Sequence, residues 1–300
     1  MLTNRSLFFI LPSARFVRCS LSGLAALVAV ALAAGSAAAQ QAPTVFEPQV
    51  GQAGKDVVWV PSDDLVVQKM LDVAKITPQD FVIDLGSGDG RNVIAAARRG
   101  ARALGVEYNP QMVELSRQNA LKAGVSDRAT FVEGDMYEAD ISQATALILF
   151  LLPGNLEKLT PRFLDMKPGS RIVDNSFAIP GWQADVTEQV DGECQTWCTA
   201  LMWIVPAKVH GTWRLPDGEI VFDQKFQMVS GTIKTASGSA PIENGRLRGE
   251  EITFVAGGNH YTGRVSGDTI EGRVSGSGGE RAWSATRLPH PLEDMNARTE

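Results

Sequence analysis

The sequence predicts an α/β fold with a doubly wound, Rossmann-like, mainly parallel sheet, followed by a small antiparallel β domain. Two observations carry this prediction. Between residues 81 and 177, short apolar runs alternate with amphipathic stretches of helical period, as in parallel strands joined by helices. Beyond residue 206 the helical period is lost. Short alternating runs separated by Gly, Asp-Gly and Asn-Gly turns there indicate a meander or barrel of about six to eight strands.

The helices and strands of the first part can be placed in chain order. Residues 60–76 predict a first helix, which the Ser62 hydroxyl can cap, and residues 91–100 predict a second. The dipeptide Asn109-Pro110 opens a third helix in the cap-then-proline order that starts helices. A fourth is expected over residues 154–167. The five expected strands are 81–85, 103–107, 129–135, 145–150 and 170–177.

The first 39 residues have the layout of a secretory signal peptide. Three arginines precede an apolar stretch at residues 21–34, and small residues lie at −3 and −1 of a cut after Ala39. The stretch is shorter than the roughly 20 residues that a bilayer span needs. We therefore predict export to the periplasm through a Sec-type signal, with no stable membrane span after cleavage. The alternatives are an uncleaved anchor and a mis-assigned start codon, but the next methionine, Met70, lies in a segment that the fold needs.

The domain boundaries follow from these patterns. Residues 40–56 contain Gln, Pro and Gly without a period, which predicts a flexible lead-in. The expected division is a signal peptide at 1–39, the lead-in at 40–56, the α/β domain at 57–205, the β domain at 206–290 and a polar tail at 291–300.

Net charge, cysteine content and histidine spacing limit the kinds of partner and ligand that the protein can be expected to bind. Loss of residues 1–39 removes three arginines and no acid, which shifts the net charge from −6 to −9 and gives no support to nucleic-acid binding. Cys194 and Cys198 could form a local disulfide in an oxidising compartment or remain free. The three histidines, at 210, 260 and 290, are scattered without ligand spacing, so no metal site is predicted.

The stretch "VIDLGSGDGRN" at residues 82–92 predicts a ligand site. It ends a strand and starts a helix, where glycines let the backbone approach a ligand and the helix N-terminus offers free N–H groups. The dinucleotide pattern G-x-G-x-x-G fails, because Arg91 occupies the third glycine position. The G-K-[ST] of a phosphate-binding P-loop is also absent. Asp84 and three glycines, Gly86, Gly88 and Gly90, form D-x-G-x-G-x-G instead.

This stretch resembles the first motif of the class I S-adenosylmethionine-dependent methyltransferases. That cofactor carries an amino-acid end and a sulfonium cation in place of phosphates, which suits an acidic residue in the loop. The resemblance implies that Asp84 helps to hold the methionine end. Glu107 follows 23 residues later at the end of the second strand, where an acid should accept hydrogen bonds from both ribose hydroxyls.

The resemblance extends to the third strand. Asp135 matches the family residue that binds the adenine amino group, and Met136 should pack near the ring. Carboxylates at the ends of three successive parallel strands should face one crevice. The predicted cofactor-binding residues are Asp84, Gly86, Ser87, Gly88, Gly90, Glu107, Tyr108, Asp135 and Met136.

Three further segments, "WVPSDDLVVQKML", "TALILFLLP" and "MKPGSRIVDNSF", resemble a branch that includes protein-lysine methyltransferases of mitochondrial inner-membrane proteins. That branch implies a lysine amine as acceptor. It typically has Thr where this chain has Ser62, and Tyr where this chain has Phe150. The resemblance covers residues 56–182. The predicted acceptor mouth consists of Pro61, Ser62, Leu152, Pro153 and Asn175.

The sequence leaves the catalytic residues unassigned, since in-line methyl transfer needs no base and none is evident. Trp182, Trp197 and Trp203 are either an aromatic surface for a cationic side chain or core residues. The predicted function is S-adenosylmethionine-dependent methyl transfer, with a protein as the expected acceptor. The alternative is an exported, non-catalytic binding protein on the same scaffold, with the β domain as its interaction surface.

Overall fold

The computed structural model describes residues 46–236 and 238–289. The expected signal peptide and the C-terminal tail lie outside the described residues. Within those two ranges, no helix combines the length and the apolar character needed to cross a bilayer.

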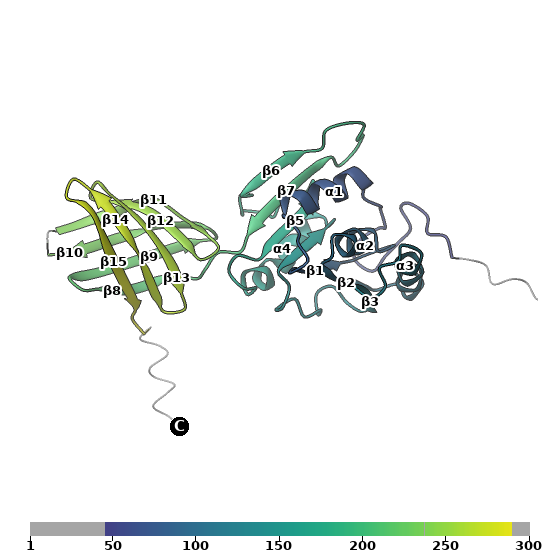
Figure 1. Cartoon of the computed structure of the whole chain (residues 1–300), viewed down its shortest axis with the longest axis horizontal. Helices are drawn as coiled ribbons and strands as arrows, with labels where there is room; N and C mark the ends of the chain where they lie inside the picture. Colours follow the sequence, from purple (N-terminus) through teal and green to yellow (C-terminus); the bar gives the residue numbers. More distant parts are fainter. Residues whose placement is uncertain (1–45, 237, 290–300) are drawn as a thin grey trace, which may run out of the picture. The chain divides into compact units, whose positions relative to one another are not determined.

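A seven-stranded sheet forms the first part, in the order β3-β2-β1-β4-β5-β7-β6 (Figure 1). β1 to β5 pair in parallel, which confirms the predicted α/β class, while β7 is antiparallel to both β5 and β6. The strands are β1 (Phe81–Leu85), β2 (Arg102–Glu107), β3 (Ala129–Glu133), β4 (Ala146–Leu149), β5 (Arg171–Asn175), β6 (Val186–Gln189) and β7 (Thr199–Ile204).

Four helices accompany the sheet: α1 (Asp64–Val73), α2 (Arg91–Arg98), α3 (Pro110–Lys122) and α4 (Pro153–Leu164). Asn109 caps α3, accepting a hydrogen bond from the Gln111 backbone N–H, with Pro110 at the first helical position as predicted. The expected cap of α1 is wrong by one residue. Asp63, not Ser62, accepts from the Leu65 N–H at 2.8 Å, because the Ser62 side chain is buried and meets Asn175.

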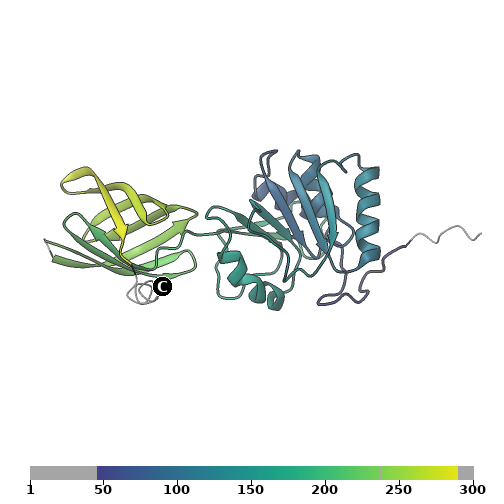
Figure 2. The same ribbon diagram turned by 90° about the horizontal axis from the view of Figure 1, so that it is seen from below.

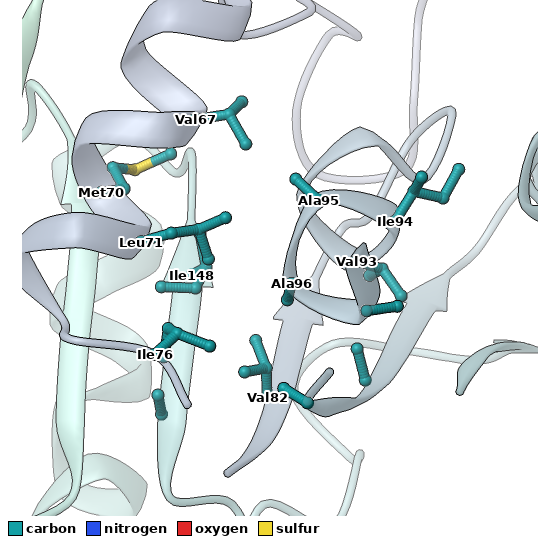
Figure 3. Close-up of a cluster of buried hydrophobic side chains, with 14 of the residues drawn as sticks. Val67, Met70, Leu71, Ile76, Val82, Val93, Ile94, Ala95, Ala96 and Ile148 are labelled. Atoms are coloured by element: carbon teal, nitrogen blue, oxygen red, sulfur yellow. The ribbon is translucent and has the colours of Figure 1, made fainter. Parts of the chain in front are cut away.

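The sheet has a hydrophobic core on each face. Neighbouring strand residues point to opposite faces, so that Val82 and Ile148 belong to one core, while Ile83 and Leu147 belong to the other. α1, α2 and α3 cover the first core, where Met70, Leu71 and Val93 pack over the strands (Figure 3). α4 covers the second. Burial on both faces explains why the central strands read as continuous apolar runs.

The strand order positions the site. The chain runs outward from β1 through β2 to β3, then returns to place β4 on the other side of β1. Such a reversal leaves a crevice at the carboxyl ends of the strands, where open α/β sheets bind ligands. Asp84 in β1 and Glu107 in β2 lie at that edge.

The second part is a closed antiparallel barrel (Figures 1 and 2). Pairing of Thr286 with Arg214 closes the ring between its last and first strands. Buried Trp213, Phe222 and Leu247 contribute to its core. The strands are β8 (Gly211–Leu215), β9 (Gly218–Lys225), β10 (Met228–Thr235), β11 (Gly238–Arg248), β12 (Glu251–Ala256), β13 (Asn259–Ser266), β14 (Thr269–Gly276) and β15 (Gly279–Arg287). The predicted antiparallel β domain is thereby confirmed.

Candidate functional site

One cleft brings the three predicted acids together. Asp84 enters it from β1, Glu107 from the end of β2 and Asp135 from the loop after β3. Gly86, Ser87, Gly88, Tyr108 and Met136 line the same cleft, whereas Gly90 does not. The structure therefore gathers eight of the nine predicted cofactor-binding residues around one cavity.

The glycine loop is tightly packed by the protein itself. Gly86, Gly88 and Gly90 all have left-handed φ angles, of 79°, 54° and 83°, which favour glycine. A Cβ on Gly88 would lie 2.7 Å from the Trp59 indole nitrogen, and one on Gly90 would lie 2.7 Å from the Phe131 ring. The sequence suggested that the glycines admit a ligand. At these two positions, neighbouring aromatic rings already exclude a side chain.

Glu107 holds the loop in place. One of its carboxylate oxygens accepts from the Gly88 N–H at 2.9 Å, and the other accepts from the Asn109 N–H at 2.9 Å. A carboxylate oxygen can accept more than one hydrogen bond. Glu107 can therefore position the loop and still receive the two hydroxyls of a ribose.

Asp84 is fully buried and accepts a hydrogen bond from the Asn92 amide at 3.1 Å. Burial raises the pKa of Asp84 to about 8, and the negative charges of Glu107 and Asp89 act in the same direction. The Ser87 hydroxyl and the Asn92 carbonyl oxygen, both in residues that line the cleft, have no hydrogen-bond partner among the described residues. These groups fit a ligand end that carries positive charge and hydrogen-bond donors, as an amino-acid moiety does.

An N-terminal strap, residues 49–62, forms part of the cleft wall through residues 52–62. Gly51 donates to the Trp59 carbonyl and Trp59 to the Gln52 carbonyl, both at 2.9 Å, and residues 52–62 all face the cavity. The predicted lead-in is thus partly a wall of the site. The sequence pattern missed it because hydrogen bonds hold the strap in place without any helical or strand period.

Lys55 of the strap forms an ion pair with Asp135 and lies 5.1 Å from the centre of the Tyr108 ring. The hydrogen bond from Lys55 lowers the pKa of Asp135, with a second contribution from the Tyr137 N–H. The same contact raises the pKa of Lys55. Both groups are therefore charged at neutral pH, and an adenine amino group would compete with Lys55 for Asp135.

The predicted acceptor mouth is only partly assembled at the cleft. Pro61 and Ser62 line it, and Asn175 reaches it indirectly by donating to the Ser62 hydroxyl at 3.3 Å. Leu152 and Pro153 do not line the cavity; they lie at the start of α4. Phe150, where the sequence departs from the related branch, does line it.

The three tryptophans that could belong to a surface or to the core differ in their surroundings. Trp182 and Trp203 are fully buried and belong to the second core of the sheet. Trp197 is different, since 41% of it is exposed. It lies between Cys194 and Cys198, which form a disulfide.

Comparison with known proteins identifies the family. Residues 84–186 match the model of the ANTKMT methyltransferase domain. A protein-lysine N-methyltransferase of Saccharolobus islandicus is 41% identical over 140 residues, which cover 45% of this chain and 87% of that protein. The chain belongs to the S-adenosylmethionine-dependent methyltransferases.

Other similar proteins share a smaller part of their length or act on other acceptors. The adenine nucleotide translocase lysine N-methyltransferase of Mus musculus is 34% identical over 129 residues, and this chain spans only 56% of its length. A solved RNA methyltransferase of Salinibacter ruber, in complex with S-adenosyl-L-homocysteine, is 42% identical. The match covers 50% of this chain and 96% of the Salinibacter ruber chain, with a TM-score of 0.47.

Family membership gives this methyltransferase its cofactor, S-adenosylmethionine, and does not favour a non-catalytic binding protein on the same scaffold. The matched region, residues 84–186, contains the glycine loop and all three acids of the cleft. It stops before the barrel.

Proposed function

We propose that this methyltransferase modifies the amine of a lysine side chain in a protein. The observation that carries the proposal is the 41% identity to an archaeal protein-lysine N-methyltransferase over nearly all of that protein's length. A net charge of −6 is compatible with a basic acceptor. We also propose that the protein is exported to the periplasm. This part of the proposal rests only on the sequence of the first 39 residues.

Different residues of the cleft would hold different parts of the cofactor. Asp84, Asn92 and Ser87 would hold the amino-acid end, Glu107 the ribose hydroxyls and Asp135 the adenine amino group. When bound, S-adenosylmethionine supplies a methyl group whose bond to sulfur breaks, leaving the electron pair on sulfur, as its bond to the acceptor nitrogen forms. The protein aligns the acceptor and excludes water, and the strap contributes to the second task.

The acceptor amine must lose its proton before it can react. Its nitrogen uses its lone pair to bind the methyl carbon, and the alkylated nitrogen then releases a proton to solvent. Burial lowers the pKa of an amine, so an apolar entrance favours the reactive neutral form without a dedicated base.

Titration of the purified full chain with S-adenosylmethionine, followed by methylation of a cell lysate with isotopically labelled cofactor, tests the proposal. Binding together with label on lysine residues is the expected result. Absence of binding would overturn the function altogether, label on another residue type would overturn the acceptor, and binding without transfer would favour the non-catalytic alternative.

A matched pair of variants locates the cofactor. Glu107→Gln should weaken binding by about 10- to 100-fold, because it removes charge-assisted acceptors in the cleft. Glu133→Gln, two residues before Asp135 but exposed in β3 and outside the cleft lining, should bind as the wild type does. Equal affinities for the two variants would show that the ribose acid is misplaced.

A further inference from the structure

An aromatic cluster adjoins the cofactor cleft through Phe150. It consists of Phe150, Phe177 and Trp197. The Phe150 ring stacks against Phe177 with centroids 6.0 Å apart and meets Trp197 edge to face at 5.5 Å. Phe150 also lines the cofactor cleft, as do Pro61 and Ser62. The cluster therefore connects the cleft with the half-exposed Trp197.

Trp197 is held in an unfavourable backbone conformation. Its φ of 55° lies in the left-handed region, which a bulky residue rarely adopts. The Cys194–Cys198 disulfide encloses it, and the Val190 N–H donates to the Cys198 carbonyl at 2.8 Å. Strain of this kind persists only where the surroundings enforce it, and it concentrates at functional sites. The indole remains 41% exposed, so burial accounts for only part of this arrangement.

The same segment carries an excess of negative charge. Between Arg171 and Lys208 the sequence has five acidic residues and neither Lys, Arg nor His. Only three of the acids, Glu188, Asp191 and Glu193, are exposed, since Asp174 is buried and Asp185 pairs with Arg246. Lys69 lies 3.5 Å from Glu188 and 3.6 Å from Asp191, and so offsets only part of this charge. The loop that presents Trp197 should attract cations.

We propose that the aromatic cluster binds the ammonium-bearing side chain of the acceptor, with Trp197 as a specificity-determining residue whose position the disulfide fixes. The proposal rests on the proposed function, since it concerns the acceptor of the same reaction. Aromatic faces attract ammonium groups, and Trp does so best. Because the cluster favours the charged form, the amine releases its proton to solvent only when it moves on into the cleft, where burial lowers its pKa.

A binding experiment tests the cluster without turnover. The probes are choline and its uncharged isostere 3,3-dimethyl-1-butanol, titrated into the full chain. The readout is the NMR signal of the Trp197 indole N–H, assigned through Trp197→Phe. Choline should shift this signal in a saturable manner and the alcohol should not. If both probes shift it, or neither does, the cluster does not recognise a cation.

Kinetics with poly-L-lysine and S-adenosylmethionine give a second test. Trp197→Ala should raise the KM for poly-L-lysine by about 3- to 30-fold, with kcat and the Kd of the cofactor unchanged. Trp197→Phe should restore most of the loss. Leu121→Ala truncates an apolar side chain on α3 that is 71% exposed, and it should leave KM unchanged. A Trp197→Ala enzyme with wild-type KM would overturn the proposal.

The Cys194–Cys198 disulfide allows an independent test of how Trp197 is positioned. Cys194→Ser, or reduction of the wild-type chain with dithiothreitol, should raise the KM as Trp197→Ala does, because the loop loses the link that fixes the indole. Reduction should have no further effect on Trp197→Ala. Independent effects of the two changes would contradict the positioning role. If the cofactor itself fails to bind, the proposed function fails first, and the choline titration still decides the cluster.

Discussion

Asp84 combines full burial with a position in a cleft that must receive a cationic ligand. In the free protein its pKa is raised to about 8, chiefly by burial, so it is mostly protonated at pH 7. A sulfonium and an ammonium favour the carboxylate and should lower that pKa. Binding of S-adenosylmethionine below pH 8 should therefore release a proton, and the affinity should fall as the pH is lowered from 8 to 6, by at most about tenfold per pH unit.

Titration calorimetry in buffers of different ionisation enthalpy measures this proton directly. At pH 6.5 the expected release approaches one proton per cofactor bound. Asp84→Asn should abolish the pH dependence, since an amide does not titrate in this range. Wild-type binding without proton exchange between pH 6 and 8 would mean that Asp84 is already ionised in the free protein.

Lys55 and Asp135 make a second residue-level prediction. Lys55 occupies a hydrogen-bonding oxygen of the carboxylate that should receive the adenine amino group. Lys55→Met keeps the apolar stem near Tyr108 and removes the competing charge. Because the pair is partly solvent-exposed, its contribution is small, and the variant should bind S-adenosylmethionine about two- to fivefold more tightly. Weaker binding would show that Lys55 closes over the cofactor instead of competing with it.

At the level of elements, the turn between β1 and α2 depends on glycine for two separate reasons. Gly90→Ala meets both an unfavourable φ and the Phe131 ring, whereas Gly124→Ala, after α3, has a similar φ of 69° and open space around it. Gly124→Ala should lower the free energy of unfolding by about 1 kcal/mol. Gly90→Ala should cost about 1–3 kcal/mol more, from overpacking. Urea unfolding of the two variants measures the difference, and equal losses would show that Phe131 moves aside.

Within the sheet, the sequence predicted β1 to β5 and missed β6 and β7. β1, β4 and β5 are buried along nearly their whole length, so their apolar runs are clear. β6 is largely exposed, with the sequence VTEQ, and shows no apolar period. β7 begins at Thr199, directly after Cys198, so the sequence does not separate its apolar run from the disulfide loop before it. The strap and the Phe150–Trp197 contact depend on tertiary packing between distant residues, which no local pattern encodes.

The meeting of the three acids in one cleft, by contrast, could be predicted from their places along the chain. Parallel strands deliver their carboxyl ends to one edge, so position along the chain fixes position in space. Asp84, Glu107 and Asp135 therefore meet at one cleft. Leu152 and Pro153 do not line that cleft, because α4 begins at Pro153 and leads the chain away to the other core.

At the level of the whole molecule, the sheet and the barrel have separate hydrophobic cores. Trp182, Trp203 and Phe163 belong to a core of the sheet, whereas Trp213 and Phe222 belong to that of the barrel. Phe226, in the turn between β9 and β10, stacks on Trp182 with centroids 5.1 Å apart. This ring contact, the hydrogen bond from Gln227 to the Gln183 carbonyl and the Arg246–Asp185 ion pair are small beside either core, so the two parts should unfold in separate transitions.

Differential scanning calorimetry with and without cofactor tests this independence. A ligand stabilises only the unit that binds it, by about 2.7 kcal/mol at a concentration of 100 Kd. S-adenosylmethionine should therefore raise the transition temperature of the sheet and leave that of the barrel unchanged. Trp213→Ala removes a fully buried ring from the barrel, costs about 3–5 kcal/mol, and should lower the other transition alone. One transition that moves as a whole in both experiments would mean that the barrel is an integral part of the cofactor-binding unit, and that the methyltransferase fold of this chain depends on it.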